Sequence, residues 1–109
     1  MRDRPSFQVD VGEDQDAAAT MVTVTGDIDL ASVDRLERAR ERALSRPAGL
    51  LVIDLRGVRF IDSSGLKFLI ETDRLARSRG WELQVRRPSE AAMRPFVVTG
   101  VDKHLPFVD

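Results

Sequence analysis

The sequence predicts an α/β fold with a mixed, partly parallel sheet. Two segments, 7–11 and 21–26, alternate apolar and polar residues as half-buried strands do. A continuous apolar run from Leu50 to Leu55, interrupted only by Asp54, is typical of a strand buried on both faces. After the second segment, stretches with helical spacing of apolar residues alternate with strand-like runs. This alternation of strand and helix indicates an α/β class.

The first two strands are expected to form an antiparallel hairpin. FQVDV (7–11) and MVTVTG (21–26) carry the alternating pattern, and the second is rich in β-branched residues. Between them, GEDQDAAA (12–19) has the acidic, small-residue composition of a flexible loop. We therefore expect two short strands joined by a longish connection.

A first helix is predicted between Asp27 and Gly49. Asp29 or Ser32 can cap its start, and RPAG (46–49) ends it. Its apolar residues recur at helical spacing: Val33, Leu36, Ala39, Ala43 and Leu44. The arginines between them are interpreted as a solvated helix face: Arg38, Arg40 and Arg42.

The segment after the buried strand leads to a second helix. RGVRF (56–60) is interpreted as a turn and a short extension that brings the chain to Asp62. The second helix is expected from Ser63 or Ser64 to about Arg79, where Gly80 ends it.

The last third of the chain is predicted to hold one more strand and one weaker helix. WELQV (81–85) has a strand pattern. The helix begins at Ser89 and Glu90 and is interrupted by Pro95. DKHLPFVD (102–109) closes the chain.

Length and composition restrict the class of protein. A chain of 109 residues is the usual size of one domain, here taken as 1–109, and 42% hydrophobic residues suffice for a core. A net charge of −1 indicates neither a nucleic-acid surface nor an acidic disordered tail. The absence of cysteine excludes thiol catalysis, disulfides and thiolate metal sites. With no signal peptide and no membrane-spanning run, we expect a cytoplasmic protein that does not contact membranes.

Two enzymatic interpretations are weak. Asp27 and Asp29 could form an acid pair for phosphoryl transfer or magnesium, but Ala31 stands where the phosphatase motif requires threonine or valine, so a turn and helix start is favoured. His104 could complete a triad with Ser63 and Asp62, but no G-x-S-x-G elbow is present. One histidine without cysteines cannot supply the usual zinc ligands, and no phosphate-binding glycine motif occurs, so we expect no metal or cofactor.

The stretch FIDSSGL (60–66) carries the strongest functional signal. Asp62 is a good helix N-cap, which places Ser63 at the first helical position with its hydroxyl projecting from the helix start. Gly65 has no side chain to shield that hydroxyl, and Ser64 adds a second one. A phosphate on Ser63 would suit the positive helix end and would act on anything docked over it. A plain N-cap is the alternative interpretation, and on the local residues alone it is favoured over a phosphorylation switch.

The second helix has apolar residues on two faces. Leu66, Leu69 and Ala76 share one face, while Phe68 and Leu75 lie nearly opposite. Coverage of both faces by neighbouring elements is favoured, with an apolar docking patch beside the serines as the alternative. Further residues of the first face are Ile70 and Asp73, and an arginine partner for Asp73 is possible.

Three segments together resemble the bacterial STAS-domain anti-sigma-factor antagonists: GDIDLASVDRL (26–36), LLVIDLRGVRFIDSSGL (50–66) and GVDKHLPF (100–107). The resemblance covers a core of about residues 7–107. It implies a single STAS-like domain, with a mixed β-sheet and helices packed mainly on one face.

The resemblance also implies a function. Family members are regulators without catalytic activity or cofactor. The dephosphorylated form binds an anti-sigma factor that is also a serine kinase, which releases the sigma factor. That kinase uses ATP and magnesium to phosphorylate the first serine after the aspartate, here Ser63, and this abolishes binding until a separate serine phosphatase acts. The implied partner-binding residues are Asp27, Asp29, Asp62, Ser63, Ser64, Gly65, Lys67 and Phe68.

Two departures and one rival function accompany the resemblance. Lys67 replaces a small residue, and Asp73 stands where family members are usually less acidic, so both could tune which kinase is recognised. The rival is an unphosphorylated STAS scaffold subunit of a larger signalling or transport assembly, although a pure scaffold has no need of both serines.

Overall fold

Five strands form one mixed sheet in the order β1-β2-β3-β4-β5. The computed structural model describes residues 7–15, 18–47 and 49–109. The strands are β1 (Phe7–Asp14), β2 (Ala19–Ile28), β3 (Leu50–Ile61), β4 (Glu82–Arg86) and β5 (Phe107–Val108). The β1–β2 pair is antiparallel, and each later neighbouring pair is parallel. The α/β class and the mixed sheet are confirmed.

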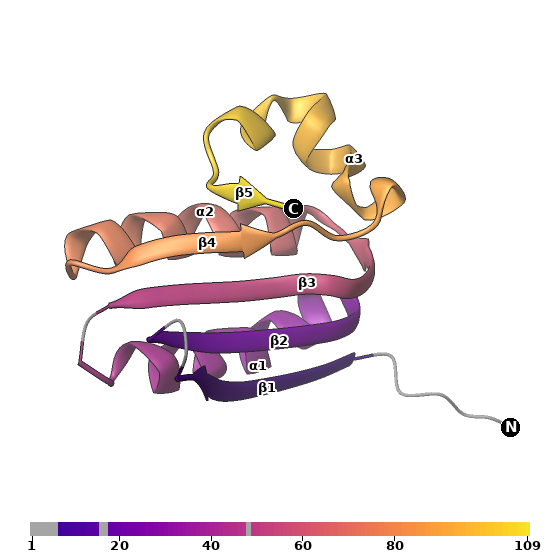
Figure 1. Ribbon diagram of the computed structural model, residues 1–109. Helices are drawn as coiled ribbons and strands as arrows, with labels where there is room; N and C mark the ends of the chain where they lie inside the picture. Colours follow the sequence, from indigo (N-terminus) through magenta and orange to yellow (C-terminus); the bar gives the residue numbers. More distant parts are fainter. Residues whose placement is uncertain (1–6, 16–17, 48) are drawn as a thin grey trace, which may run out of the picture.

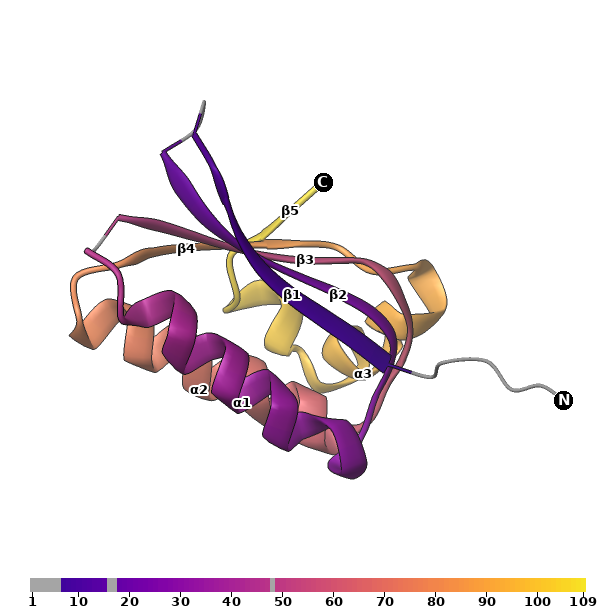
Figure 2. The ribbon, with the colours of Figure 1, turned by 90° about the horizontal axis from the view of Figure 1, so that it is seen from below.

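Three α-helices connect the parallel strands. They are α1 (Leu30–Leu44), α2 (Ser63–Ser78) and α3 (Glu90–Thr99), followed by the short 3-10 helix η1 (Val101–Lys103). Figure 1 shows the order of the elements, and Figure 2 shows α1 and α2 side by side against one face of the sheet. Helices lie mainly on one face, as expected. No helix within the described ranges is long and apolar enough to cross a membrane.

The core lies between this helical layer and the sheet. The apolar stripe predicted for α1 faces the sheet, where Leu36, Ala39, Ala43 and Leu44 are buried. Val24, Ile53 and Val85 meet it from three neighbouring strands. At the far end of the sheet, Phe96 of α3 is fully buried and packs edge-on against Phe107 at a ring distance of 5.3 Å.

Several boundaries differ from the predictions. The hairpin strands reach Asp14 and begin again at Ala19, so they include half of the predicted loop (residues 16 and 17 lie outside the described part). The segment 56–60 is strand rather than a turn, because β2 continues to pair with it across two register shifts. Phe107 and Val108 add a strand that was not predicted, too short for a periodic signal. The third helix continues through Pro95, held by the buried Met93 and Phe96.

Arg40 corrects the interpretation of the α1 arginines as a solvated face. Its guanidinium is buried between α1 and α2, where it donates to the Thr72 hydroxyl at 3.0 Å and lies 4.9 Å from the centre of the Phe68 ring. The Thr72 hydroxyl in turn donates to the Phe68 carbonyl at 2.7 Å. Arg38 and Arg42 are exposed, as predicted. The charge of Arg40 therefore lies inside the helix–helix contact and holds Phe68 in place.

The acid within the buried strand, Asp54, is paired with an arginine. Arg56, two residues along the same face of β3, donates from its side chain to both carboxylate oxygens at 3.0 and 2.9 Å. These hydrogen bonds lower the pKa of the Asp54 carboxyl below its ordinary value, although burial acts in the opposite direction. The strand therefore accommodates a charge at a position that is 7% exposed.

The Asp54 pair predicts a dependence of stability on acid. Because the folded-state pKa is lowered, the carboxyl takes up its proton more readily in the unfolded chain, and its contribution is lost as pH falls through and below its ordinary value of 3.8. We expect Asp54→Asn to cost about 1 kcal/mol at neutral pH and less at about pH 3. Urea denaturation of both proteins at the two pH values measures this. A difference that stays constant with pH would contradict it.

Gly65 makes a second stability prediction. A Cβ at this position would lie 2.6 Å from Ile61 Cγ2 and 2.8 Å from Ile28 Cγ2, both on buried side chains. The clash outweighs the better helix propensity of alanine, so Gly65→Ala should lower the free energy of unfolding by about 1–3 kcal/mol. In the control Gly12→Ala the added Cβ meets nothing within 4 Å, and a change below about 0.5 kcal/mol is expected. Equal stability of both variants in urea would refute the account.

Candidate functional site

The carboxyl ends of β2 and β3 bring the two acidic segments of the sequence together. Asp27 is in register with Phe60, and the Asp62 N–H donates to the Ile28 carbonyl at 3.1 Å. The segment 27–29 therefore lies beside the segment 62–65, at the edge where α1 and α2 both begin (Figure 1). Loops at this edge of a parallel sheet are a common location for functional groups.

Asp62 is the N-cap of α2, as predicted. One of its carboxylate oxygens accepts from the Ser64 N–H at 2.8 Å and from the Gly65 N–H at 3.4 Å. These bonds satisfy two of the backbone donors that a helix start leaves free. The carboxylate is thereby held against the first turn of α2.

Ser63 is the first residue of α2, and its side chain is exposed. Among the described residues, its hydroxyl takes part in no hydrogen bond, while the neighbouring Ser64 is half-buried. The helix start carries partial positive charge, which favours an anion, although the Asp62 carboxylate already accepts from the Ser64 and Gly65 N–H groups. The arrangement presents an accessible hydroxyl where an added phosphate would be stabilised by the helix.

Gly65 has a different role from the one the sequence suggested. It is buried and faces the sheet, so it neither shields nor exposes Ser63. Its missing side chain lets the first turn of α2 approach Ile28 and Ile61. Gly65 thus lets the turn that carries the serines pack closely on the sheet, and it presents no side chain to a partner.

Lys67 and Phe68 are separated by the structure. Lys67 is exposed one turn after Ser63, so the two side chains share one helix face. Phe68 is only 3% exposed and packs under Arg40 in the helix–helix contact. The alternative of a docking patch formed by Phe68 and Leu75 is therefore wrong, and coverage by neighbouring elements is confirmed.

Asp27 and Asp29 do not act as a pair. Asp29 is the N-cap of α1, where its carboxylate accepts from the Ser32 N–H at 3.1 Å and its own N–H donates to the Ser32 hydroxyl at 2.9 Å. Asp27 lies 3.6 Å from a guanidinium nitrogen of Arg59. Each carboxylate thus has its own partner, which is the turn and helix start that the sequence favoured.

The structure does not unite His104 with Ser63. His104 is exposed and lines a hollow of about 370 Å³ beside the middle of α2, with Ile70, Asp73 and Arg77. Asp73 pairs there with Arg77 at 3.1 Å, which supplies the arginine partner considered from the sequence. The described part of the chain contains no group of three histidine, cysteine or acidic residues placed to hold a metal.

Exposed apolar residues near the serines were missed by sequence reasoning. Leu30 is 76% exposed and lines a hollow of about 200 Å³ with Ser64 and Lys67. Phe60 is 51% exposed and lines a second hollow of about 340 Å³ with Pro95 and Val98 of α3. The segment that carries Ser63 connects the two hollows. The sequence held one sign of this exposure, because Leu30 lies outside the apolar stripe of α1.

Asp62 allows the cap to be tested apart from its charge. Asp62→Ala removes the acceptor for two backbone donors and should lower the free energy of unfolding by about 1 kcal/mol. Asp62→Asn keeps a capping oxygen and removes the charge, so a change below about 0.5 kcal/mol is expected. Thermal or urea denaturation of both variants measures the difference. An asparagine variant as unstable as the alanine variant would show that capping is not the role of Asp62.

The comparisons with known proteins agree with the fold. The family model described as "Mlab, STAS domain" matches residues 11–109. A crystal structure of an anti-sigma factor antagonist from Mycobacterium paratuberculosis shares 34% identity with a TM-score of 0.81, covering 94% of this chain and 85% of that one. The anti-sigma-B factor antagonist of Bacillus subtilis (strain 168) is 29% identical over 87% of this chain and 86% of its own length.

A more distant structure supports the fold alone. The anti-sigma factor antagonist SpoIIAA in its unphosphorylated form superposes with a TM-score of 0.73 at 16% identity, over 94% of this chain and 86% of that one. With the family model spanning nearly the whole chain and an antagonist structure one-third identical to it, the chain belongs to the STAS-domain family of anti-sigma-factor antagonists.

Proposed function

We propose that this chain binds an anti-sigma factor that is also a serine kinase, and that phosphorylation of Ser63 ends the binding. In its dephosphorylated form the chain occupies the anti-sigma factor and releases the sigma factor. The kinase transfers a phosphoryl group from ATP, with magnesium, to the Ser63 hydroxyl, and a serine phosphatase removes it. The main support for this proposal is the Ser63 hydroxyl at the capped start of α2. It is exposed and makes no hydrogen bond among the described residues.

The relatives supply the class of partner. The matched proteins are described as antagonists of anti-sigma factors, one of them of the sigma-B system. These proteins are regulators, and the proposal gives this chain a regulatory role without catalysis of its own. Since sigma factors act in the cytoplasm, the proposed function places the chain there.

Phosphorylation at Ser63 would act on the complex and leave the fold intact. The phosphate adds about 1.5 to 2 negative charges at a helix start, where an anion is favourable. A partner group of like charge at about 4 Å would be repelled by about 4 kcal/mol at an effective dielectric constant of 20. Reversing a binding equilibrium from 99:1 to 1:99 requires about 5.5 kcal/mol. Charge repulsion, the bulk of the phosphate and the cost of removing water from it together reach that size.

The surface around Ser63 suits a docked protein. Apolar Leu30 and Phe60 flank the serine segment in two separate hollows, while Asp27, Asp62 and Lys67 supply charges between them. Protein interfaces combine apolar contacts with charged and polar ones, and this surface offers both kinds. Gly65 and Phe68 contribute to this surface by position only, since both are buried.

The decisive experiment compares two substitutions at Ser63. Ser63→Ala is used as bait in source lysate to capture the kinase, which is then purified and titrated against each variant by calorimetry. We expect Ser63→Ala to bind whether or not ATP and magnesium are present. Ser63→Asp should bind at least about tenfold more weakly, or about 1.4 kcal/mol, and give an unchanged circular dichroism spectrum.

A matched serine provides the control. Ser64→Ala should still accept phosphate from the captured kinase at Ser63, as located by mass spectrometry, whereas Ser63→Ala should accept none. Equal affinity of the Ser63→Ala and Ser63→Asp variants, or phosphate only on Ser64, would refute the switch. A stable large assembly that never accepts phosphate would instead favour the scaffold role.

A further inference from the structure

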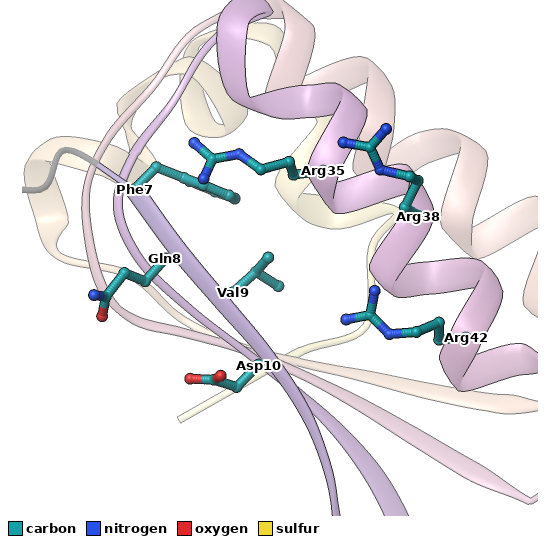
Figure 3. A pocket seen from close by; sticks show the side chains of 7 residues that line it. All are labelled: Phe7, Gln8, Val9, Asp10, Arg35, Arg38 and Arg42. Atoms are coloured by element: carbon teal, nitrogen blue, oxygen red, sulfur yellow. The ribbon is translucent and has the colours of Figure 1, made fainter.

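An arginine-lined groove runs between α1 and the edge strand β1, outside the Ser63 site. It has a volume of about 540 Å³, and its arginines are Arg35, Arg38 and Arg42. Figure 3 shows Arg35 and Arg42 reaching from α1 toward β1 while Arg38 lies along the helix, with Phe7 and Val9 pointing from β1 toward α1. Gln8 and Asp10 extend from the opposite side of β1.

The three guanidinium groups are weakly neutralised. Arg42 has no side-chain partner among the described residues, and Arg35 lies 4.6 Å from the centre of the Phe7 ring without an acid. Arg38 pairs with Asp34 at 3.0 Å, but both side chains are about two-thirds exposed, and such a pair contributes little. The groove therefore holds more positive than negative charge, with Asp34 and Asp10 as the nearby acids, and an anionic occupant fits it.

β1 offers backbone hydrogen bonds along the same groove. It pairs with β2 alone within the described sheet, so its second edge has no strand beside it. The strand runs from Phe7 to Asp14 with regular pairing and contains no proline or lysine, two common devices against edge pairing. Added strands on such edges are a recurrent mode of peptide recognition.

The spacing of the arginines matches alternate residues of an added strand. Positions 35, 38 and 42 lie on one helix face and span about 10 Å at 1.5 Å per residue. Side chains on one face of a strand repeat about every 7 Å, so two or three alternate carboxylates reach this row. On the other face the added strand would meet Asp10, where an acid is unfavourable. The occupant therefore carries acidic residues at alternate positions only.

A second copy of this chain fits less well. Paired through β1, it would bring mainly apolar Phe7, Val9 and Val11 toward the arginines, and the one acid of β1 on that face, Glu13, already pairs with Arg46 at 3.3 Å. From charge and edge together, we propose that β1 binds an extended acidic segment of a partner protein as an added strand. Its alternate carboxylates pair with Arg35, Arg38 and Arg42.

The test is an NMR titration of the full-length ¹⁵N-labelled chain with the acetylated, amidated peptide TETETET. Amide shifts should change along β1, with the affinity falling as salt rises. Arg42→Gln should weaken binding about two- to fivefold, and the Arg38→Gln, Arg42→Gln double variant about tenfold. The exposed Arg74→Gln on α2 has the same charge change away from the groove and should bind as the wild type does. Ser63→Asp should also bind normally, which separates this test from the proposed switch.

Strand addition is tested with modified peptides. One peptide is N-methylated at every glutamate and another at every threonine, and one of them must fail because alternate N–H groups point to opposite edges. TKTKTKT should not bind. Absence of β1 shifts up to about 5 mM peptide, unchanged affinity of both methylated peptides, or equal effects of Arg42→Gln and Arg74→Gln would overturn the proposal. So would self-association through β1 in sedimentation of the chain alone.

Discussion

The first turn of α2 lies so close to the ends of β2 and β3 that position 65 has no room for a side chain. A Cβ there would fall within 2.8 Å of methyl groups on Ile28 and Ile61. The Asp62 N–H reaches the Ile28 carbonyl in the same region, so the helix start is tied to both strands by packing and by a hydrogen bond. With the inner side of the turn held this way, Ser63 faces outward.

A rigid helix start allows chemistry at the surface to leave the core unchanged. Behind the first turn, Phe68 is held between the helices by Arg40 and Thr72, whose hydroxyl also bonds to the α2 backbone. The residues that could meet a partner, Leu30 and Phe60 among them, lie on elements already fixed by the core. Binding at this edge therefore requires little rearrangement, which favours a switch that works by charge and bulk.

Two surfaces of different character lie on the same domain. The edge around Ser63 combines apolar side chains with a few charges, whereas the β1 edge combines free backbone groups with a row of arginines. The first suits a folded partner and the second an extended acidic segment. They are built from different elements, α2 with the strand ends in one case and α1 with β1 in the other, so the two interactions need not compete.

Local patterns in the sequence determined the hairpin, the stripe of α1, the buried strand from Leu50 to Leu55 and the cap that places Ser63 at a helix start. Each depends on neighbours within a few residues, where periodicity and capping act. Tertiary structure decided why position 65 is glycine, that Arg40 and Phe68 are buried, that β3 continues to Ile61, and that Asp27 meets Arg59. Those features depend on which strand or helix packs against each residue, and that neighbouring element comes from a distant part of the chain.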